Sequence, residues 1–195
     1  MLGLSVDSDV RIIILGLWIL IGIVWLSAGL STKRVARAQQ AGSRFTHVLI
    51  LLIAFLLLFD NRLNVGPLNR RFLSPGLSAQ YLGLVLTGIG AAFAIWARLL
   101  LGTNWSATVT LKEDHRLIKS GPYALVRHPI YSGLLLAMLG TALAIAEYRC
   151  LLAVLVALLA WRAKWMVEEQ FMSEQFGVEY SDYKRNVKAV IPFVW

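Results

Sequence analysis

The residues best suited to chemistry lie around one proline in the C-terminal half of the chain. The segment Arg127-His128-Pro129-Ile130-Tyr131 opens a long apolar block. Pro129 suits the first turn of a helix, where its missing N–H costs nothing. His128 would then lie near the N-cap, beside free backbone N–H groups, and Arg127 would add a fixed cation. This arrangement predicts a site for a small anion such as a carboxylate or phosphate. A snorkelling arginine with an interfacial histidine would give the same pattern.

A second group of charges, Lys164, Glu168 and Glu169, closes the last apolar block. Lys164 and Glu168 are four residues apart and share a helical face. Carboxylates are unfavourable at a helix C-terminus, so we expect the helix to continue towards Phe176. Glutamate at a membrane boundary is costly, which favours a functional role such as binding an ammonium group or ribose hydroxyls. A solvated turn beyond the membrane is the alternative.

Two further polar segments flank these groups. The loop before Gly121 contains His115, which is suited to bind a ligand or simply to be solvated. Residues 176–185 carry aromatic side chains at helical spacing, which predicts either a helix at the membrane interface or a lid over a bound cofactor. The three histidines are too scattered for a metal site, so we expect no metal.

The elements that must position these residues are membrane helices. Of 195 residues, 58% are hydrophobic and 15% are charged, against roughly 45–50% and about 25% in soluble domains. This composition, with Cys150 as the one cysteine, excludes a disordered chain, a disulfide scaffold and a soluble Rossmann enzyme. We predict an all-α membrane bundle forming a single domain, 1–195. Its five spans are expected at about 11–30, 45–59, 80–101, 130–146 and 150–167. The first, which follows an acidic start, is expected to be retained rather than cleaved.

The basic residues predict the orientation of these spans. The net charge is +8, but no basic stripe with interleaved aromatic residues favours nucleic acid. With the N-terminus outside, 14 of the 19 lysines and arginines lie on the inner side. The other five are Arg11, Arg62, Arg70, Arg71 and Arg149. Segments 102–129 and 168–195 would then share the cytoplasmic face, which brings the candidate residues together. The outer loop 61–79 is expected to carry no chemistry.

The third span carries small residues at four-residue spacing, at Gly83, Thr87 and Ala91. No strand precedes Gly83, Gly88 and Gly90, so they do not form a phosphate loop. The spacing instead predicts close packing of this helix against another.

Taken in order, these segments resemble the isoprenylcysteine carboxyl methyltransferase family. The resemblance covers roughly residues 100–195 and rests on five pieces. They are His115-Arg116-Leu117-Ile118, the Gly-x-Tyr ending in Tyr123, Arg127-His128-Pro129-Ile130-Tyr131, Glu168-Glu169, and Phe176-Gly177-x-x-Tyr180-x-x-Tyr183.

The resemblance implies a membrane methyltransferase that uses S-adenosylmethionine without a Rossmann domain. The residues that it assigns to cofactor binding are His115, Arg116, Leu117, Ile118, Tyr123, His128, Pro129, Ile130, Tyr131, Glu168 and Glu169. We expect Arg127, Glu168 and Lys164 to act on the reacting groups. Lys164 stands where eukaryotic members have a substrate-binding arginine, so the charge is kept but bidentate carboxylate recognition is lost.

The implied acceptor is a lipid or prenylated molecule in the membrane, foremost the carboxylate of a prenylated cysteine. Methylation of a phospholipid or small amine and methylation of a thiol are alternatives within the same chemistry. An amine acceptor would have to lose a proton to a base near Glu168 or Glu169. A small transporter or a scaffold is the alternative without catalysis, and would carry charges within its spans rather than at one face. The oligomeric state does not follow from the sequence.

Overall fold

The computed structural model describes residues 7–29, 35–38, 41–74, 76–102, 110–112 and 117–194. Five long helices form a bundle: α1 (Ser8–Gly29), α2 (Ala41–Phe59), α3 (Leu77–Leu101), α5 (Pro129–Ile145) and α6 (Tyr148–Phe176). The short elements are β1 (Val35–Ala38), the 3-10 helix η1 (Gly66–Asn69), β2 (Thr110–Lys112), α4 (Pro122–Leu125) and α7 (Val178–Asn186). The predicted helical bundle is thus confirmed, and the antiparallel pair β1–β2 is an addition that the sequence did not predict.

Among the residues that the structure describes, three helices are long and apolar enough to cross a membrane, namely α1, α3 and α6. The apolar stretch of α2 (Phe45–Phe59) and α5 are shorter. Full crossing by these two therefore stays a prediction. Large apolar side chains are exposed along the bundle, among them Ile19, Leu82 and Leu159, as expected for helices that face lipid. Helix α6 continues to Phe176, which confirms the predicted extension beyond residue 167.

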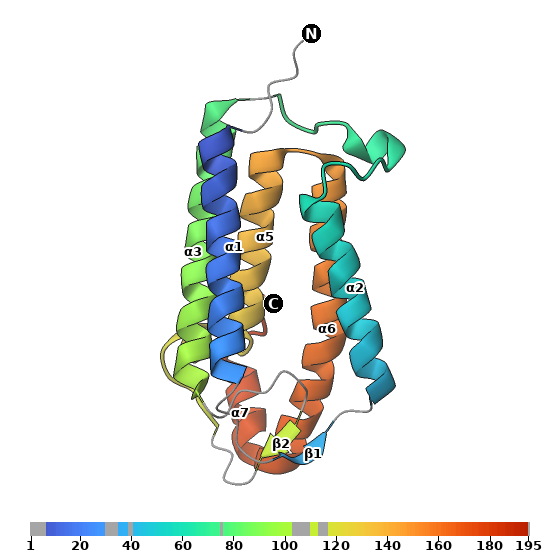
Figure 1. The fold of residues 1–195 in the computed structure, drawn as a ribbon. Coiled ribbons are helices and arrows are strands. Elements are labelled where there is room, and N and C mark those ends of the chain that lie inside the picture. The colour runs from blue at the N-terminus through green and yellow to red at the C-terminus, as the bar shows by residue number, and fades with distance from the viewer. Residues whose placement is uncertain are drawn as a thin grey trace.

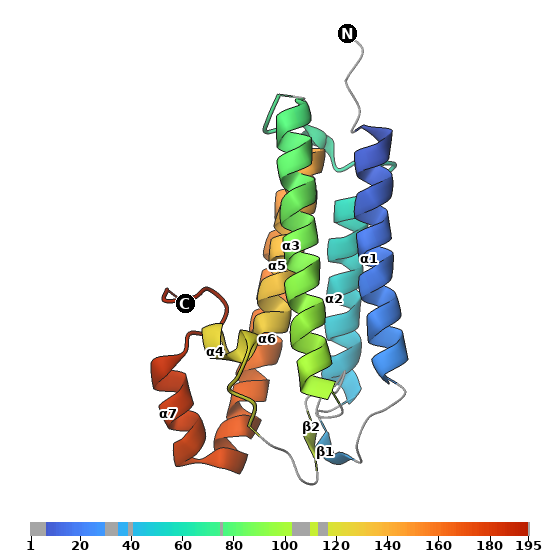
Figure 2. The ribbon, with the colours of Figure 1, turned by 90° about the vertical axis from the view of Figure 1, so that its left-hand side faces the viewer.

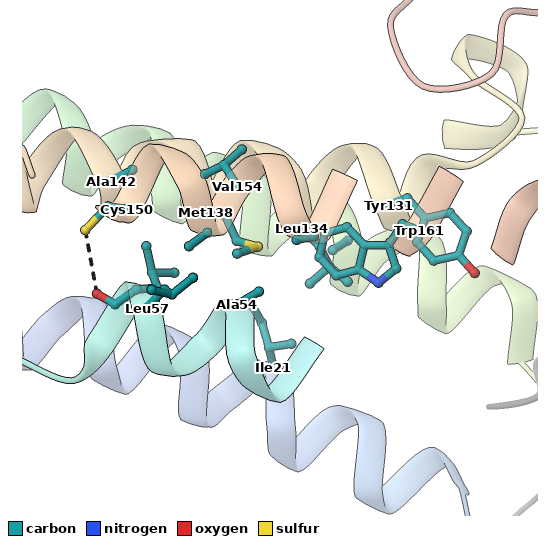
Figure 3. Close-up of a cluster of buried hydrophobic side chains, with 14 of the residues drawn as sticks. Ile21, Ala54, Leu57, Tyr131, Leu134, Met138, Ala142, Cys150, Val154 and Trp161 are labelled. Carbon is teal, nitrogen blue, oxygen red and sulfur yellow. Dashed lines mark hydrogen bonds between the residues drawn. The ribbon is translucent and has the colours of Figure 1, made fainter. Parts of the chain in front are cut away.

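The helices form two packed groups in Figure 1, with α1, α3 and α5 on one side and α2 with α6 on the other. Contacts between α5 and α6 join the groups. An apolar cluster fills this junction, as Figure 3 shows, with Ala54 and Leu57 of α2 facing Met138 of α5 and Val154 of α6.

Glycines let α3 and α5 approach backbone to backbone. A Cβ added to Gly83 would lie 2.5 Å from the carbonyl oxygen of Gly140, and one added to Gly133 would lie 2.6 Å from the carbonyl oxygen of Gly90. The Thr87 hydroxyl between them donates to the Gly83 carbonyl at 2.8 Å. The predicted close packing of the third span is confirmed, although Gly88 faces open space and takes no part.

Candidate active site

The candidate residues gather at one end of the bundle. In Figure 2, α4, α7 and the C-terminal segment lie together at the lower end, on the far side of α5 and α6 from α1 and α2. Gly177 makes this possible, because its positive φ of 51° ends α6 and turns the chain into α7. The start of α5, the end of α6 and α7 therefore meet at one place.

The turn before α5 is held by the backbone that follows α7. The backbone N–H of Arg127 donates to the Lys188 carbonyl at 2.8 Å, and that of His128 donates to the Ala189 carbonyl at 2.9 Å. The Ser132 hydroxyl donates to the Val190 carbonyl at 2.7 Å. This segment thus runs beside the turn and orients the side chains that leave it.

Glu169 is the centre of a buried ion-pair network. Its Oε1 accepts hydrogen bonds from Arg127, at 2.9 Å from Nε and 2.6 Å from Nη2. The same oxygen lies 3.1 Å from His128 Nε2, while Oε2 lies 2.8 Å from Lys184 Nζ. Arg127 also donates to the carbonyls of Lys184 and Val187. The network therefore connects α5, α6 and α7.

Glu168 lies beside this network but is far less engaged. Its Oε1 accepts a hydrogen bond from the Tyr131 hydroxyl at 2.6 Å, and its Oε2 lies 3.7 Å from His128 Nδ1. The Glu168 side chain is 27% exposed, against 11% for Glu169. Glu168 is thus the carboxylate of the pair that an external group can reach.

Aromatic rings form a wall next to Glu168. The Tyr131 ring stacks on Trp161 with centroids 5.9 Å apart, and the His128 ring stacks on Trp165 at 5.7 Å. Figure 3 shows Tyr131 and Trp161 at one end of the apolar cluster. An aromatic face beside a carboxylate is suited to a cation.

Helix α7 is locked onto α4 by a tyrosine. The Tyr183 hydroxyl donates to the Tyr123 carbonyl at 2.5 Å, and Tyr180 is also buried. Burial raises the pKa of Tyr183 to about 12, although Arg127 acts against this shift, so the phenol stays a hydrogen-bond donor at neutral pH. The aromatic residues of α7 thus face the protein, as a lid would require.

The structure brings most of the predicted site residues together. Pro129 occupies the first turn of α5, as predicted, and His128 is its N-cap. The residues that meet at this end are Tyr123, Arg127, His128, Pro129, Ile130, Tyr131, Glu168 and Glu169. His115 and Arg116 lie outside the described residues, whereas Leu117 and Ile118 are half-buried in the loop before α4.

Lys164 lies one turn before Glu168 on α6, and its charge interacts with His47 of α2. It is half-buried and lies next to the site residues of α6.

Sequence reasoning missed three residues of this site. Trp161 and Trp165 precede Glu169 by eight and four residues, so all three lie on one face of the helix. This spacing could have identified the two tryptophans from the sequence. Lys184 carried no such signal, because its pairing with Glu169 depends on how α7 folds back.

Comparison with known proteins shows which family this chain resembles. The phospholipid methyltransferase family model matches residues 78–179, which is more than half of the chain. Protein-S-isoprenylcysteine O-methyltransferase A of Arabidopsis thaliana is 30% identical over 136 residues, covering 65% of this chain and 68% of the relative. A probable enzyme of the same name from Oryza sativa subsp. indica is 33% identical over 120 residues, covering 59% of this chain. The chain spans 62% of the length of that relative.

A solved structure shares the fold. It is a eukaryotic intramembrane Ras methyltransferase, isoprenylcysteine carboxyl methyltransferase, with a TM-score of 0.54 and 24% identity. The match covers 76% of this chain and 53% of the other. With the family match over residues 78–179 and the Arabidopsis relative, the chain belongs to the isoprenylcysteine carboxyl methyltransferase family.

Proposed function

We propose that this protein transfers a methyl group from S-adenosylmethionine to a lipid-attached acceptor, most directly the carboxylate of a prenylated cysteine. The observation that carries the proposal is the reachable Glu168 carboxylate, held by Tyr131 beside an aromatic wall within the family domain. The relatives' names supply the acceptor class.

The side chains present fit this donor. The reachable carboxylate of Glu168 suits the ammonium or the ribose hydroxyls of S-adenosylmethionine. The N-terminus of α5 has no side-chain cap, which leaves backbone N–H groups for the carboxylate of the donor. The buried rings of Tyr131 and Trp161 lie behind this carboxylate and would give a sulfonium bound next to it an aromatic surrounding. When bound, the donor supplies an electrophilic methyl group on that sulfonium.

The protein's own task is then alignment and exclusion of water. Methyl transfer is an in-line displacement, so correct placement of donor and acceptor lowers the barrier most. A carboxylate acceptor is already ionised and needs no general base. We assign Lys164 to the acceptor, because it lies one turn before Glu168 on α6 and stands where eukaryotic family members have a substrate-binding arginine. Arg127, whose bonds all run to protein groups, would position Glu169 and the segment after α7.

The location of the site fits a donor that comes from water and an acceptor that comes from the membrane. All of its elements lie at one end of the bundle, where the predicted orientation places the cytoplasm. A water-soluble donor would enter from that side, whereas a lipid-attached acceptor would enter between helices from the membrane.

Phospholipid N-methylation is a second candidate, because the matching family model carries that description. An amine acceptor has to lose a proton, and Glu169 is already paired with Arg127, Lys184 and His128. Glu168 would have to serve as the base in that case.

Calorimetric titration of detergent-purified protein with S-adenosylmethionine tests the donor. We expect micromolar binding that weakens at least 10-fold in Glu168→Gln. Glu174→Gln, an exposed substitution of the same kind on α6, is the matched control and should bind like the unmodified protein. Equal affinity in all three proteins would contradict the assigned site.

Transfer of a labelled methyl group then tests the acceptor. Reactions with a farnesylated cysteine, phosphatidylethanolamine and a small thiol should label the farnesylated cysteine most. Labelling of phosphatidylethanolamine alone would overturn the carboxylate proposal and favour the second candidate.

A further inference from the structure

A separate pocket lies at the opposite end of the bundle from the candidate active site. Its volume is about 200 Å³, and it is bordered by the start of α1, the ends of α2 and α5, the loop after α2 and the start of α6. The 17 residues of α5 separate the two ends by about 25 Å. This pocket therefore takes no part in the chemistry proposed above.

The pocket concentrates positive charge. Arg11, Arg71 and Arg149 line it, with Glu147 as the one carboxylate among the lining residues. Because Glu147 pairs with Arg149 at 2.5 Å, its charge is already matched. Within the described part of the chain, neither Arg11 nor Arg71 forms an ion pair. The pocket thus presents two guanidinium groups that have no carboxylate partner among the described residues.

One arginine is rigidly built in. Arg149 is 2% exposed, and its Nη1 donates to the carbonyls of Leu57 at 2.6 Å and Asp60 at 3.2 Å. The strand-like bridge between Arg71 and Glu147 fixes the loop after α2 against the same turn. The Arg149 guanidinium and the backbone of Arg71 are therefore in place before any ligand arrives, which lowers the entropic cost of binding.

Apolar side chains also line the pocket. Ile14 and Leu15 come from α1, Phe59 from α2 and Ile145 from α5. A free inorganic anion gains nothing from contact with apolar side chains. A lipid, in contrast, has a charged headgroup directly joined to apolar chains. A pocket lined by both guanidinium groups and apolar side chains matches the phosphate and the adjoining chain of a phospholipid.

The predicted orientation makes this concentration of charge unusual. Only five basic residues are expected on the outer side, and three of them line this one pocket. Arg62 and Arg70 belong to the same end but do not line it. We propose that the pocket bounded by Arg11, Arg71 and Arg149 binds the phosphate headgroup of an anionic phospholipid from the outer leaflet.

The test measures thermal unfolding of the full chain in neutral detergent. Added phosphatidylglycerol should raise the unfolding midpoint by about 5 °C. Phosphatidylcholine or inorganic phosphate at the same concentration should leave it nearly unchanged. An equal rise with inorganic phosphate would overturn the lipid assignment in favour of a free anion.

Variants locate the effect. Arg11→Gln with Arg71→Gln should remove the rise caused by phosphatidylglycerol. Arg62→Gln with Arg70→Gln, a matched loss of two charges at the same end, should keep it. Should the first pair fold poorly, Arg11→Gln alone, at an exposed position, should at least halve the rise. An undiminished rise in the Arg11 variants would overturn the proposal. Since the readout is stability, it does not depend on methyl transfer.

Discussion

Two neighbouring glutamates on α6 differ in role because their surroundings differ. Glu169 is buried among Arg127, His128 and Lys184, whereas Glu168 accepts one hydrogen bond from Tyr131 and remains partly exposed. A buried carboxylate with several cations holds elements together, while an accessible one is available to a ligand. The first organises the site, and the second is assigned to the donor.

Glu169→Gln is therefore expected to damage stability more than Glu168→Gln. Removing the charge leaves Arg127, His128 and Lys184 without their common partner and should cost roughly 3 kcal/mol. Glu168→Gln should cost less than about 1 kcal/mol, because it can still accept from Tyr131. Chemical unfolding of both variants in detergent measures this difference, and equal losses would contradict the assigned roles.

Arg127→Lys tests whether geometry matters beyond charge. A lysine keeps the attraction to Glu169 but cannot also reach the carbonyls of Lys184 and Val187. We expect the segment after α7 to exchange its amide hydrogens at least 10-fold faster. Lys184→Arg, which keeps the charge at an exposed position, is the control and should exchange at the original rate.

At the scale of elements, the bundle depends on one unusually close helix pair. Helices α3 and α5 touch through Gly83, Gly90, Gly133 and Gly140, which carry no side chain at the contact. Close approach of this kind is a common way to associate helices in a membrane, where burial of apolar surface contributes little.

Gly83→Val should separate the two helices and destabilise the protein by more than about 2 kcal/mol. The new side chain would meet the backbone of Gly140 and Ala144, which cannot move aside cheaply. A Cβ added to Gly88 on the same helix would meet nothing within 4 Å, so Gly88→Val serves as the control. The unfolding midpoints of the two variants should differ by several degrees, and similar values would contradict this packing role.

Helix α7 is a second element whose placement affects the site. Tyr183→Phe removes the hydroxyl that binds the Tyr123 carbonyl but keeps the ring. We expect a loss of about 1 kcal/mol, seen as faster proteolysis within α7. The protease sensitivity of the loop between α2 and α3 should not change, and an equal change there would indicate global rather than local loosening.

The whole molecule presents its two polar ends to different sides if the predicted orientation holds. Ser74 lies in the loop before α3, Ser181 lies on α7, and both are exposed. Two variants, Ser74→Cys and Ser181→Cys, therefore place one reactive thiol at each end. A membrane-impermeant thiol reagent applied outside intact cells should label Ser74→Cys only. Cys150 is buried and provides an unlabelled background. Labelling of Ser181→Cys alone would reverse the predicted orientation.

The helical membrane class, the order of the apolar blocks and the turn at Pro129 could all be predicted from the sequence, and the adjacent pair Glu168–Glu169 could be singled out as a candidate. These features follow from local runs and spacings, which are visible in a linear chain. The folded structure was needed to show which glutamate is paired with cationic side chains, that Lys184 completes this network, and that Arg11, Arg71 and Arg149 line one pocket. Such outcomes depend on contacts between residues far apart in the chain, and no local pattern encodes which of them will meet.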